Sequence, residues 1–150
     1  MEDDISFKYI TLWQDKFDDI IKNVPNDWDI IKLHSSFYKI VNNFISIYEK
    51  TGSKYIKNNN MKDNSSTGLY IVNRKYINKF LEKYYKNNEL TIKGTIAADY
   101  LLYYNFNVYN YTIPLITSTC NISTIMDRHN NFDKKSNRVI NEYYNKLTSK

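Results

Sequence analysis

The residues able to do chemistry are few, and they stand far apart in the sequence. The chain has two histidines, His34 and His129, and one cysteine, Cys120. Neither histidine has a companion at the spacing that metal sites use, and Cys120 lacks the surroundings of a catalytic thiol. A lone cysteine of this kind is usually a buried structural thiol. These residues therefore predict neither a metal centre nor a nucleophile.

Carboxylates and glycines offer the other routes to chemistry. Asp15, Asp18 and Asp19 could form an acid–base set, but we interpret them as a solvated helix face. The three glycines, at 52, 68 and 94, are isolated, so the chain has no phosphate loop and no dinucleotide fingerprint. We therefore expect no enzymatic activity, no catalytic residue, no cofactor and no metal.

The elements that would position these residues are expected to be helices. The chain has 150 residues with 3 glycines and 2 prolines, which predicts a single domain, residues 1–150, rich in long helices. Apolar residues recur at spacings of three and four along most of it. The helices that we expect are 3–22, 28–50, a short one within 53–61, 69–86, 90–106, 112–127 and 132–147.

A basic stripe runs along the expected helix 69–86. Lys75, Lys79, Lys83 and Lys86 share one face of it. Such a stripe is compatible with nucleic-acid binding, but a solvated face is the simpler interpretation in a lysine-rich chain of net charge +5. We predict no nucleic-acid partner.

Charge and hydropathy also bear on location. Residues 1–30 hold eight acids and three bases, whereas residues 31–150 hold eight acids and eighteen bases. No run approaches the 18 or so apolar residues that a membrane span needs, and the acidic N-terminus has no apolar signal core. We predict an intracellular protein with no membrane partner.

The stretch "ELTIKGTIAADYLLYYNF", residues 89–106, carries few charges for an expected helix. Between Leu90 and Phe106 its only charged residues are Lys93 and Asp99, and it carries Gly94, Ala97 and Ala98. Small residues allow neighbouring helices to approach closely, and an apolar surface on all sides needs helices around it. This stretch therefore predicts the central helix of a bundle.

Four short motifs give the chain a resemblance to a known family. They are "YITLW" in the first expected helix, "FYKIVNNF" in the second, "LTIKGTIA" at the start of the central helix and "YYNKL" near the end. In their order and spacing they resemble the poxvirus Bcl-2-like family of intracellular virulence factors. The resemblance implies an all-α fold, a Bcl-2-like bundle of six to seven helices around a central buried helix.

The family resemblance also implies a function. It implies a viral, non-enzymatic inhibitor of host innate immune signalling, through NF-κB or interferon-regulatory-factor activation, that binds a host signalling protein in the host cell cytoplasm. The alternative is a viral apoptosis inhibitor that holds pro-apoptotic helices in a surface groove. Apoptosis inhibitors of this fold commonly place an arginine after the glycine of the central helix. Here Thr95 follows Gly94, which favours signalling inhibition.

A homodimer is the last expectation. Several family members dimerise through the first and sixth helices, and the first expected helix here carries a second apolar stripe, Ile10, Trp13 and Phe17. The sixth would offer small residues for close packing. The predicted protein interface is therefore Ile10, Trp13, Phe17, Pro114, Thr117 and Ser118.

Overall fold

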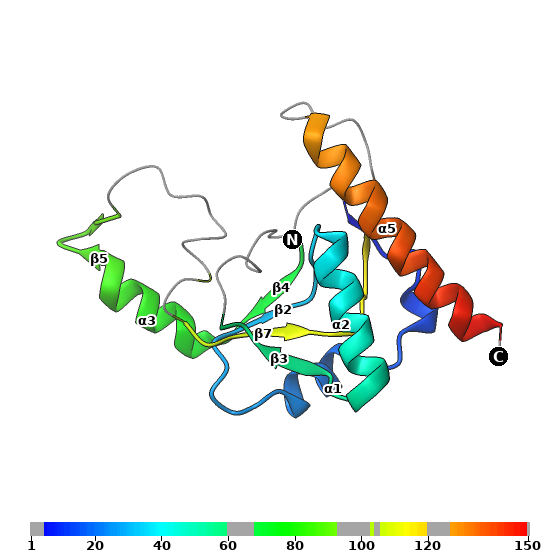
Figure 1. The fold of residues 1–150 in the computed structure, drawn as a ribbon. Coiled ribbons are helices and arrows are strands. Elements are labelled where there is room, and N and C mark those ends of the chain that lie inside the picture. The colour runs from blue at the N-terminus through cyan, green and yellow to red at the C-terminus, as the bar shows by residue number, and fades with distance from the viewer. Residues whose placement is uncertain (1–4, 60–67, 93–102, 104–105, 120–126, 150) are drawn as a thin grey trace.

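The centre of the molecule is a mixed β-sheet. The computed structural model describes residues 5–59, 68–92, 103, 106–119 and 127–149 (Figure 1). The sheet has four strands in the order β3-β7-β2-β4, formed by Tyr55–Lys57, Val108–Tyr111, Ile30–Lys32 and Tyr70–Val72. The central strands β7 and β2 are parallel, and each edge strand is antiparallel to its neighbour. The fold is therefore α/β, and the prediction of an all-α Bcl-2-like bundle is wrong.

Short apolar runs form the two central strands. The strand β2 and the residue that follows it read Ile-Ile-Lys-Leu, and β7 reads Val-Tyr-Asn-Tyr, so both are rich in the β-branched and aromatic residues that suit a sheet. Every residue of both strands is buried. The register pairs Lys32 with Asn110 on one side and with Tyr70 on the other.

Different parts of the chain cover the two faces of the sheet. On one face, Ile31 and Tyr109 pack with Ile20 of α1 (Phe17–Asn23). On the opposite face, Ile30 and Val108 form a second cluster with Val72, three tyrosines and two phenylalanines. The residues of that second cluster outside the central strands include Tyr70, Val72, Tyr76, Phe80, Tyr103 and Phe106.

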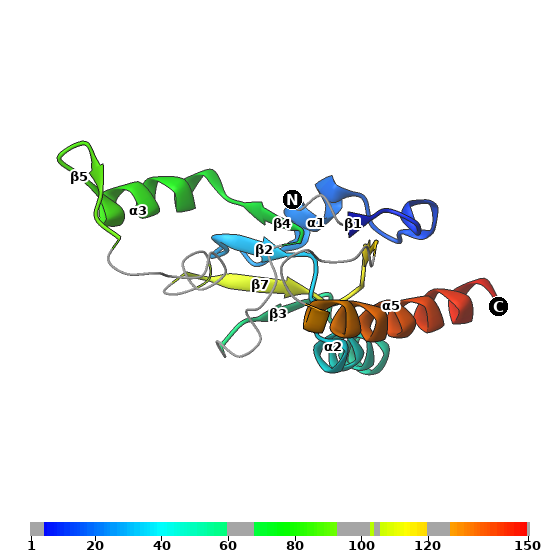
Figure 2. The ribbon, with the colours of Figure 1, turned by 90° about the horizontal axis from the view of Figure 1, so that it is seen from above.

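Two long helices pack together beside the sheet. These are α2 (Tyr38–Thr51) and α5 (Asp127–Thr148), which lie side by side in Figure 2. Val41 and Ile45 of α2 and Ile140 of α5 belong to the main core cluster. Helix α2 ends at Gly52, whose φ of +71° is the left-handed conformation that glycine adopts most easily.

The N-terminal segment attaches to the chain that follows β7. The strand β1 (Ile5–Ser6) pairs antiparallel with β8 (Thr117–Ser118), with Ser6 opposite Thr117. A short 3-10 helix, η1 (Ile10–Leu12), follows it. The indole Nε1 of Trp13 then donates a hydrogen bond to the carbonyl of Leu115 at 2.8 Å.

A helix and a hairpin project from the body, as Figure 1 shows. The helix is α3 (Arg74–Tyr84), capped by the side chain of Asn73, which accepts from the backbone N–H of Lys75 at 3.1 Å. The strands β5 (Tyr85–Lys86) and β6 (Glu89–Leu90) follow it. We call residues 74–90 the arm.

Several predicted helices are corrected by the described residues. The expected helix 28–50 starts with a strand and is helical in 38–51, and 69–86 is helical in 74–84. The expected helix 3–22 is reduced to η1 and α1, and residues 53–61 contain β3. Residues 112–119 contain the strand β8 and no helical residue, so the prediction of a sixth helix is wrong there. The helix predicted for 132–147 is confirmed within α5.

The predicted central helix lies mainly outside the described residues. Of residues 90–106, positions 93–102, 104 and 105 are not described, and Gly94, Thr95, Ala97 and Ala98 are among them. The described residue Tyr103 is buried. None of the helices in the described part of the chain has the length and apolar character required to cross a membrane.

Candidate functional site

A row of buried polar residues crosses the middle of the sheet. Lys32 and Asn110 stand opposite each other on the parallel strands, and they are 2% and 3% exposed. The Nζ of Lys32 lies 5.1 Å from the centre of the Tyr103 ring, a distance at which a cation is attracted to the face of the ring. Within the described chain, Oδ1 of Asn110 accepts no hydrogen bond.

His34 follows this row at the carboxyl end of β2. Burial, together with the charge of Lys32, lowers the pKa of His34 from 6.5 to about 4, so the imidazole is neutral at pH 7. Gly68 packs directly against it, since a Cβ added to Gly68 would lie 2.5 Å from Nδ1 of His34. A larger residue at position 68 would therefore have to displace the imidazole ring.

The space beside these groups is very small. A cavity of about 20 Å³ is lined by residues from β2, α2, β7 and α5, including Lys32, His34, Asn110 and Thr112. A cavity of that size has room for one water molecule. Open α/β sheets commonly bind ligands at the carboxyl ends of their strands, but the space that the described residues leave here is only about that of a water molecule. We therefore interpret the row as a structural polar centre.

The roomier site lies at the edge of the molecule, beside β1. An open concavity of about 340 Å³ lies between the β1–β8 ribbon and α5. Its volume is that of a small-molecule site. Every lining residue is polar: Ser6, Lys8, Thr117, Ser118, Thr119, Asn137 and Asn141. We call it the β1 concavity.

Helix α5 fixes one wall of the β1 concavity through Asn137. The Nδ2 of Asn137 donates to the carbonyl of Ser118 at 2.7 Å, and its Oδ1 accepts from the Ser118 backbone N–H at 3.0 Å. An asparagine that satisfies both backbone groups of one residue acts like an additional strand partner. The position of β8 relative to α5 is thereby set.

Two stacked tyrosines lie beneath Asn141 of the β1 concavity. The hydroxyl of Tyr9 donates to Oδ1 of Asn141 at 2.5 Å, and the Tyr9 ring stacks on Tyr144 with ring centres 4.1 Å apart. Tyr144 is buried, and its hydroxyl donates to the carbonyl of Pro114 at 2.5 Å. Asn141 is thus oriented by a rigid partner, which is the arrangement that a recognition side chain needs.

Lys8 supplies the charge of the lining. It is exposed, and its Nζ lies 5.0 Å from the centre of the Tyr9 ring. The ion pairs among the described residues do not include it. Together with four hydroxyls and two amides, this gives the concavity both donors and acceptors and a positive charge.

Of the three aspartates considered as an acid–base set, Asp15 is half-buried, whereas Asp18 and Asp19 are exposed. Asp15 is occupied by Lys54, whose Nζ lies 2.7 Å from both carboxylate oxygens, and by the hydroxyl of Tyr111. Burial raises the pKa of Asp15, but the hydrogen bonds from Lys54 and Tyr111 outweigh it and bring the pKa below 3.8. Asp18 and Asp19 lie in the first turn of α1. No metal-binding group of three His, Cys, Asp or Glu occurs among the described residues.

The six predicted interface residues fall into two groups. Ile10 and Phe17 are exposed, and the half-buried Trp13 packs edge-on against Phe17 with ring centres 5.2 Å apart. Pro114, Thr117 and Ser118 are buried in the extended segment after β7. The two segments do meet, but within one chain, through β1–β8 pairing and the Trp13–Leu115 hydrogen bond.

Sequence reasoning named Thr117 and Ser118 for close packing and did not identify the β1 concavity. The signal available was the run of hydroxyl residues in Thr117, Ser118 and Thr119, combined with two asparagines one helical turn apart, Asn137 and Asn141. Comparison of the chain with models of known families, with characterised proteins and with solved structures found no match.

Proposed function

We propose that this chain binds a small, hydroxyl-rich molecule bearing phosphate, of the sugar phosphate or nucleotide-linked sugar class, in the β1 concavity. The observation that carries the proposal is that every lining residue is of a polar type. Most small-molecule sites are lined mainly by apolar and aromatic side chains with a few polar groups. A site with a hydrogen-bonding group on every lining residue favours a ligand that itself carries many hydrogen-bonding groups.

Sugar hydroxyls match this lining. A hydroxyl group both donates and accepts, as do the serine, threonine and asparagine side chains around the concavity. Asn141 is held by Tyr9, so its amide presents fixed partners to a ligand. The cost of ordering the site on binding is reduced by that support.

Lys8 supports the phosphate part of the proposal. The ammonium group of a lysine is a common phosphate partner. Lys8 is the charged residue of the lining, and it is exposed, so its Nζ is accessible to a ligand.

Calorimetry with a ligand panel tests the proposal. The panel holds a neutral monosaccharide, its 1-phosphate and a nucleoside diphosphate sugar. We expect the phosphorylated members to bind and Lys8→Ala to weaken them by about tenfold, the value of one charge-assisted hydrogen bond. Lys22→Ala, an exposed lysine of α1, is the matched control and should leave binding unchanged. Absence of binding by every member would contradict the proposal.

Protein binding through the N-terminal segment is the second candidate function. Ile10, at 54% exposed, and Phe17, at 39%, are large apolar side chains left in contact with solvent. Exposed apolar patches commonly mark interfaces. One form of protein binding stays a prediction. It is the non-enzymatic inhibition of host innate immune signalling, in which the chain would bind a host signalling protein in the host cytoplasm.

The resemblance that motivated the immune-signalling prediction implied a helical bundle, and the α/β fold removes that support. The apoptosis alternative needed a groove between the helices of such a bundle. A reporter assay for NF-κB and interferon-promoter output in transfected cells, with Ile10→Asp beside the wild type, tests the signalling prediction. Unchanged reporter output with wild-type protein would contradict it.

A further inference from the structure

The strand β4 is an edge of the four-stranded sheet. Within the described part of the chain, it pairs with β2 on one side and with no strand on the other. Each residue of β4 is half-buried, whereas each residue of its neighbour β2 is buried. The arm begins directly after this strand and projects away from the body (Figure 1). Whether the edge can accept a further strand depends on where its backbone groups point.

The hydrogen bonds between β2 and β4 show which backbone groups point outward. The carbonyl of Leu69 accepts from the backbone N–H of Leu33 at 3.0 Å, and the N–H of Asn73 donates to the residue before β2 at 2.8 Å. In an antiparallel pair, successive residues bond alternately toward the partner strand and away from it. The odd-numbered residues of this segment therefore face β2, and Tyr70 and Val72 direct their N–H and C=O groups outward. Among the described residues, no hydrogen bond joins these outward groups to another part of the chain.

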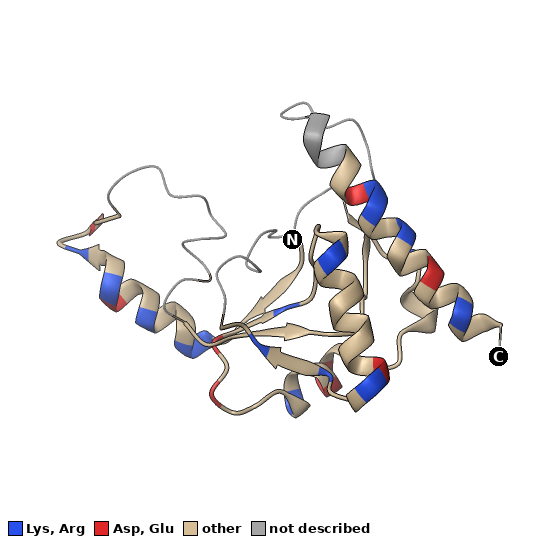
Figure 3. Cartoon of the chain, viewed as in Figure 1, with Lys and Arg blue, Asp and Glu red and all other residues tan. Residues whose placement is uncertain are grey.

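The two edges of the sheet differ in charge. Residues 68–73 read Gly-Leu-Tyr-Ile-Val-Asn, and Figure 3 shows β4 without a charged residue. The opposite edge, β3, follows Lys54 and ends at Lys57, and the hydroxyl of Ser53 donates to the carbonyl of Tyr55 at 3.0 Å. Charged side chains commonly keep an edge strand from pairing with another strand. The edge at β3 has this protection, and the edge at β4 lacks it.

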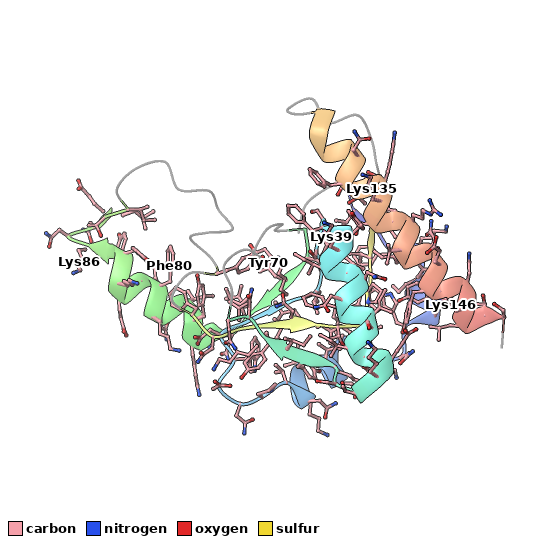
Figure 4. All side chains as sticks on the ribbon, in the orientation of Figure 1. Lys39, Tyr70, Phe80, Lys86, Lys135 and Lys146 are labelled. Carbon is pink, nitrogen blue, oxygen red and sulfur yellow. The ribbon has the colours of Figure 1, made fainter. Side chains whose placement is uncertain are left out.

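The β4 edge is complementary to itself. An antiparallel β4 from a second copy, related by a two-fold axis at Ile71, places Tyr70 of each copy opposite Val72 of the other. Each of these opposed pairs exchanges both possible backbone hydrogen bonds, so every outward group of the two strands is satisfied. A tyrosine opposite a valine is an aromatic–β-branched pair, which stabilises adjacent strands, and Figure 4 marks Tyr70 on the strand. The axis also brings Ile71 against its own copy, where a charged residue would be repelled.

We propose that two copies of this chain associate by antiparallel pairing of their β4 strands, which joins the two sheets into one. The occupant of the edge has to be an extended strand, because the open groups are backbone N–H and C=O. A second β4 matches this edge in register, in its lack of charge and in its side chains. The contact is small, so the pair is expected to dissociate on dilution. It does not involve the β1 concavity and is independent of the ligand proposed for it.

Amide hydrogen exchange of the wild-type chain, followed by NMR, tests the pairing itself. The N–H groups of Tyr70 and Val72 should exchange more slowly as the protein concentration rises, by about tenfold when roughly nine chains in ten are paired. The N–H of Ile71 faces β2 and should not respond to concentration. The N–H of Lys57 is the matched control on the opposite edge, where it points outward because its neighbour Asn58 bonds inward to β7. It should not respond either.

Sedimentation velocity over a concentration series measures the association. Val72→Pro removes an outward N–H without breaking the hydrogen bonds to β2, and edge strands accept proline at such positions. This variant should give monomers. Lys57→Pro makes the same change on the β3 edge, so it is the matched control and should associate like the wild type.

Two substitutions at the two-fold axis give the decisive result. Ile71→Lys and Ile71→Glu each bring a charge against its own copy, so each variant alone should be monomeric. Their mixture brings the introduced lysine opposite the introduced glutamate and should form a heterodimer that weakens as salt is raised. Pairing through another surface would give no such recovery.

Circular dichroism shows whether each variant is folded, and the exchange measurement on the wild type decides the case if the variants are not. Three results would overturn the proposal. They are exchange at Tyr70 and Val72 that is independent of concentration, as it would be in a wild type that stays monomeric, association that survives in folded Val72→Pro, and folded Ile71 variants that do not recover on mixing.

Discussion

The contacts of Lys32 and of Lys8 with a tyrosine ring lie in two different environments. Lys32 lies 5.1 Å from the Tyr103 ring and is buried in the sheet, whereas Lys8 lies 5.0 Å from the Tyr9 ring and is exposed. The space beside Lys32 is about 20 Å³ and that beside Lys8 about 340 Å³. The same pair of residue types can thus stabilise a closed centre or leave a charge available to a ligand, and access decides between them.

The closed centre should respond strongly to pH through His34. Its folded pKa of about 4 is below the 6.5 of an unperturbed histidine, so between these values the unfolded chain binds a proton that the folded chain does not. Stability is therefore lost as pH falls from 6.5 toward 4, by up to about 3 kcal/mol, and this group has no effect above that window. Urea unfolding at several pH values measures it. His34→Asn should flatten the dependence of the free energy of unfolding on pH. An equal slope in the variant and in the wild type would contradict the assignment.

Gly68→Ala should give the next largest effect. The added Cβ would stand 2.5 Å from Nδ1 of His34, and a buried ring has little room to yield. We expect a loss of about 2 kcal/mol in the free energy of unfolding, typical of overpacking. In a His34→Ala background the cost should largely vanish, which a double-mutant cycle by denaturant unfolding would detect.

Gly52→Ala provides the comparison for Gly68→Ala. Nothing lies within 4 Å of a Cβ added at Gly52, but its φ of +71° is unfavourable for alanine. The cost there should be about 1 kcal/mol, and it should not depend on His34. Equal dependence of both glycine variants on His34 would show that the contact is not the cause.

Substitutions in the β1 concavity should lower the free energy of unfolding less than substitutions around His34. Among them, Asn137→Ala should have the largest effect. The substitution removes both hydrogen bonds to the backbone of Ser118 and should cost about 1–2 kcal/mol. Asn141→Ala removes the single bond from Tyr9 and should cost less, while weakening ligand binding more. Parallel unfolding and calorimetry on the two variants separate these effects. A greater loss of stability in Asn141→Ala would reverse the assigned roles of the two side chains.

The sequence predicts the long helices better than the sheet. Helices α2, α3 and α5 have the regular apolar spacing of three and four that extends over several turns. Strand β2 is only Ile30–Lys32, and β4 is only Tyr70–Val72. A run of three residues is too short to show a periodicity. The predicted helices 28–50 and 69–86 therefore include these strands. The strand β2 depends on β7, and β4 depends on β2, so each has a partner far away in the sequence.

The candidate site was harder to predict for a related reason. Ser6 and Lys8 come from the start of the chain, Thr117–Thr119 from the segment after β7, and Asn137 and Asn141 from α5. None of these residues is unusual by itself. Only the pairing of β1 with β8 and the Asn137–Ser118 hydrogen bonds bring them together. Sequence patterns describe neighbours along the chain, and this site consists of neighbours in space.

The strand order has a consequence for the way the chain folds. Strand β7 lies between β3 and β2, both of which precede it, and its neighbour Asn107 bonds to Asp29, 78 positions earlier in the sequence. Until β7 is synthesised and pairs, β3 and β2 have no common partner, and the four-stranded sheet cannot form. Contacts across such long loops must offset the entropy of loop closure before they stabilise anything, which slows folding. During synthesis, the first hundred or so residues therefore wait with unpaired strand edges, the state in which a chain is most prone to aggregate.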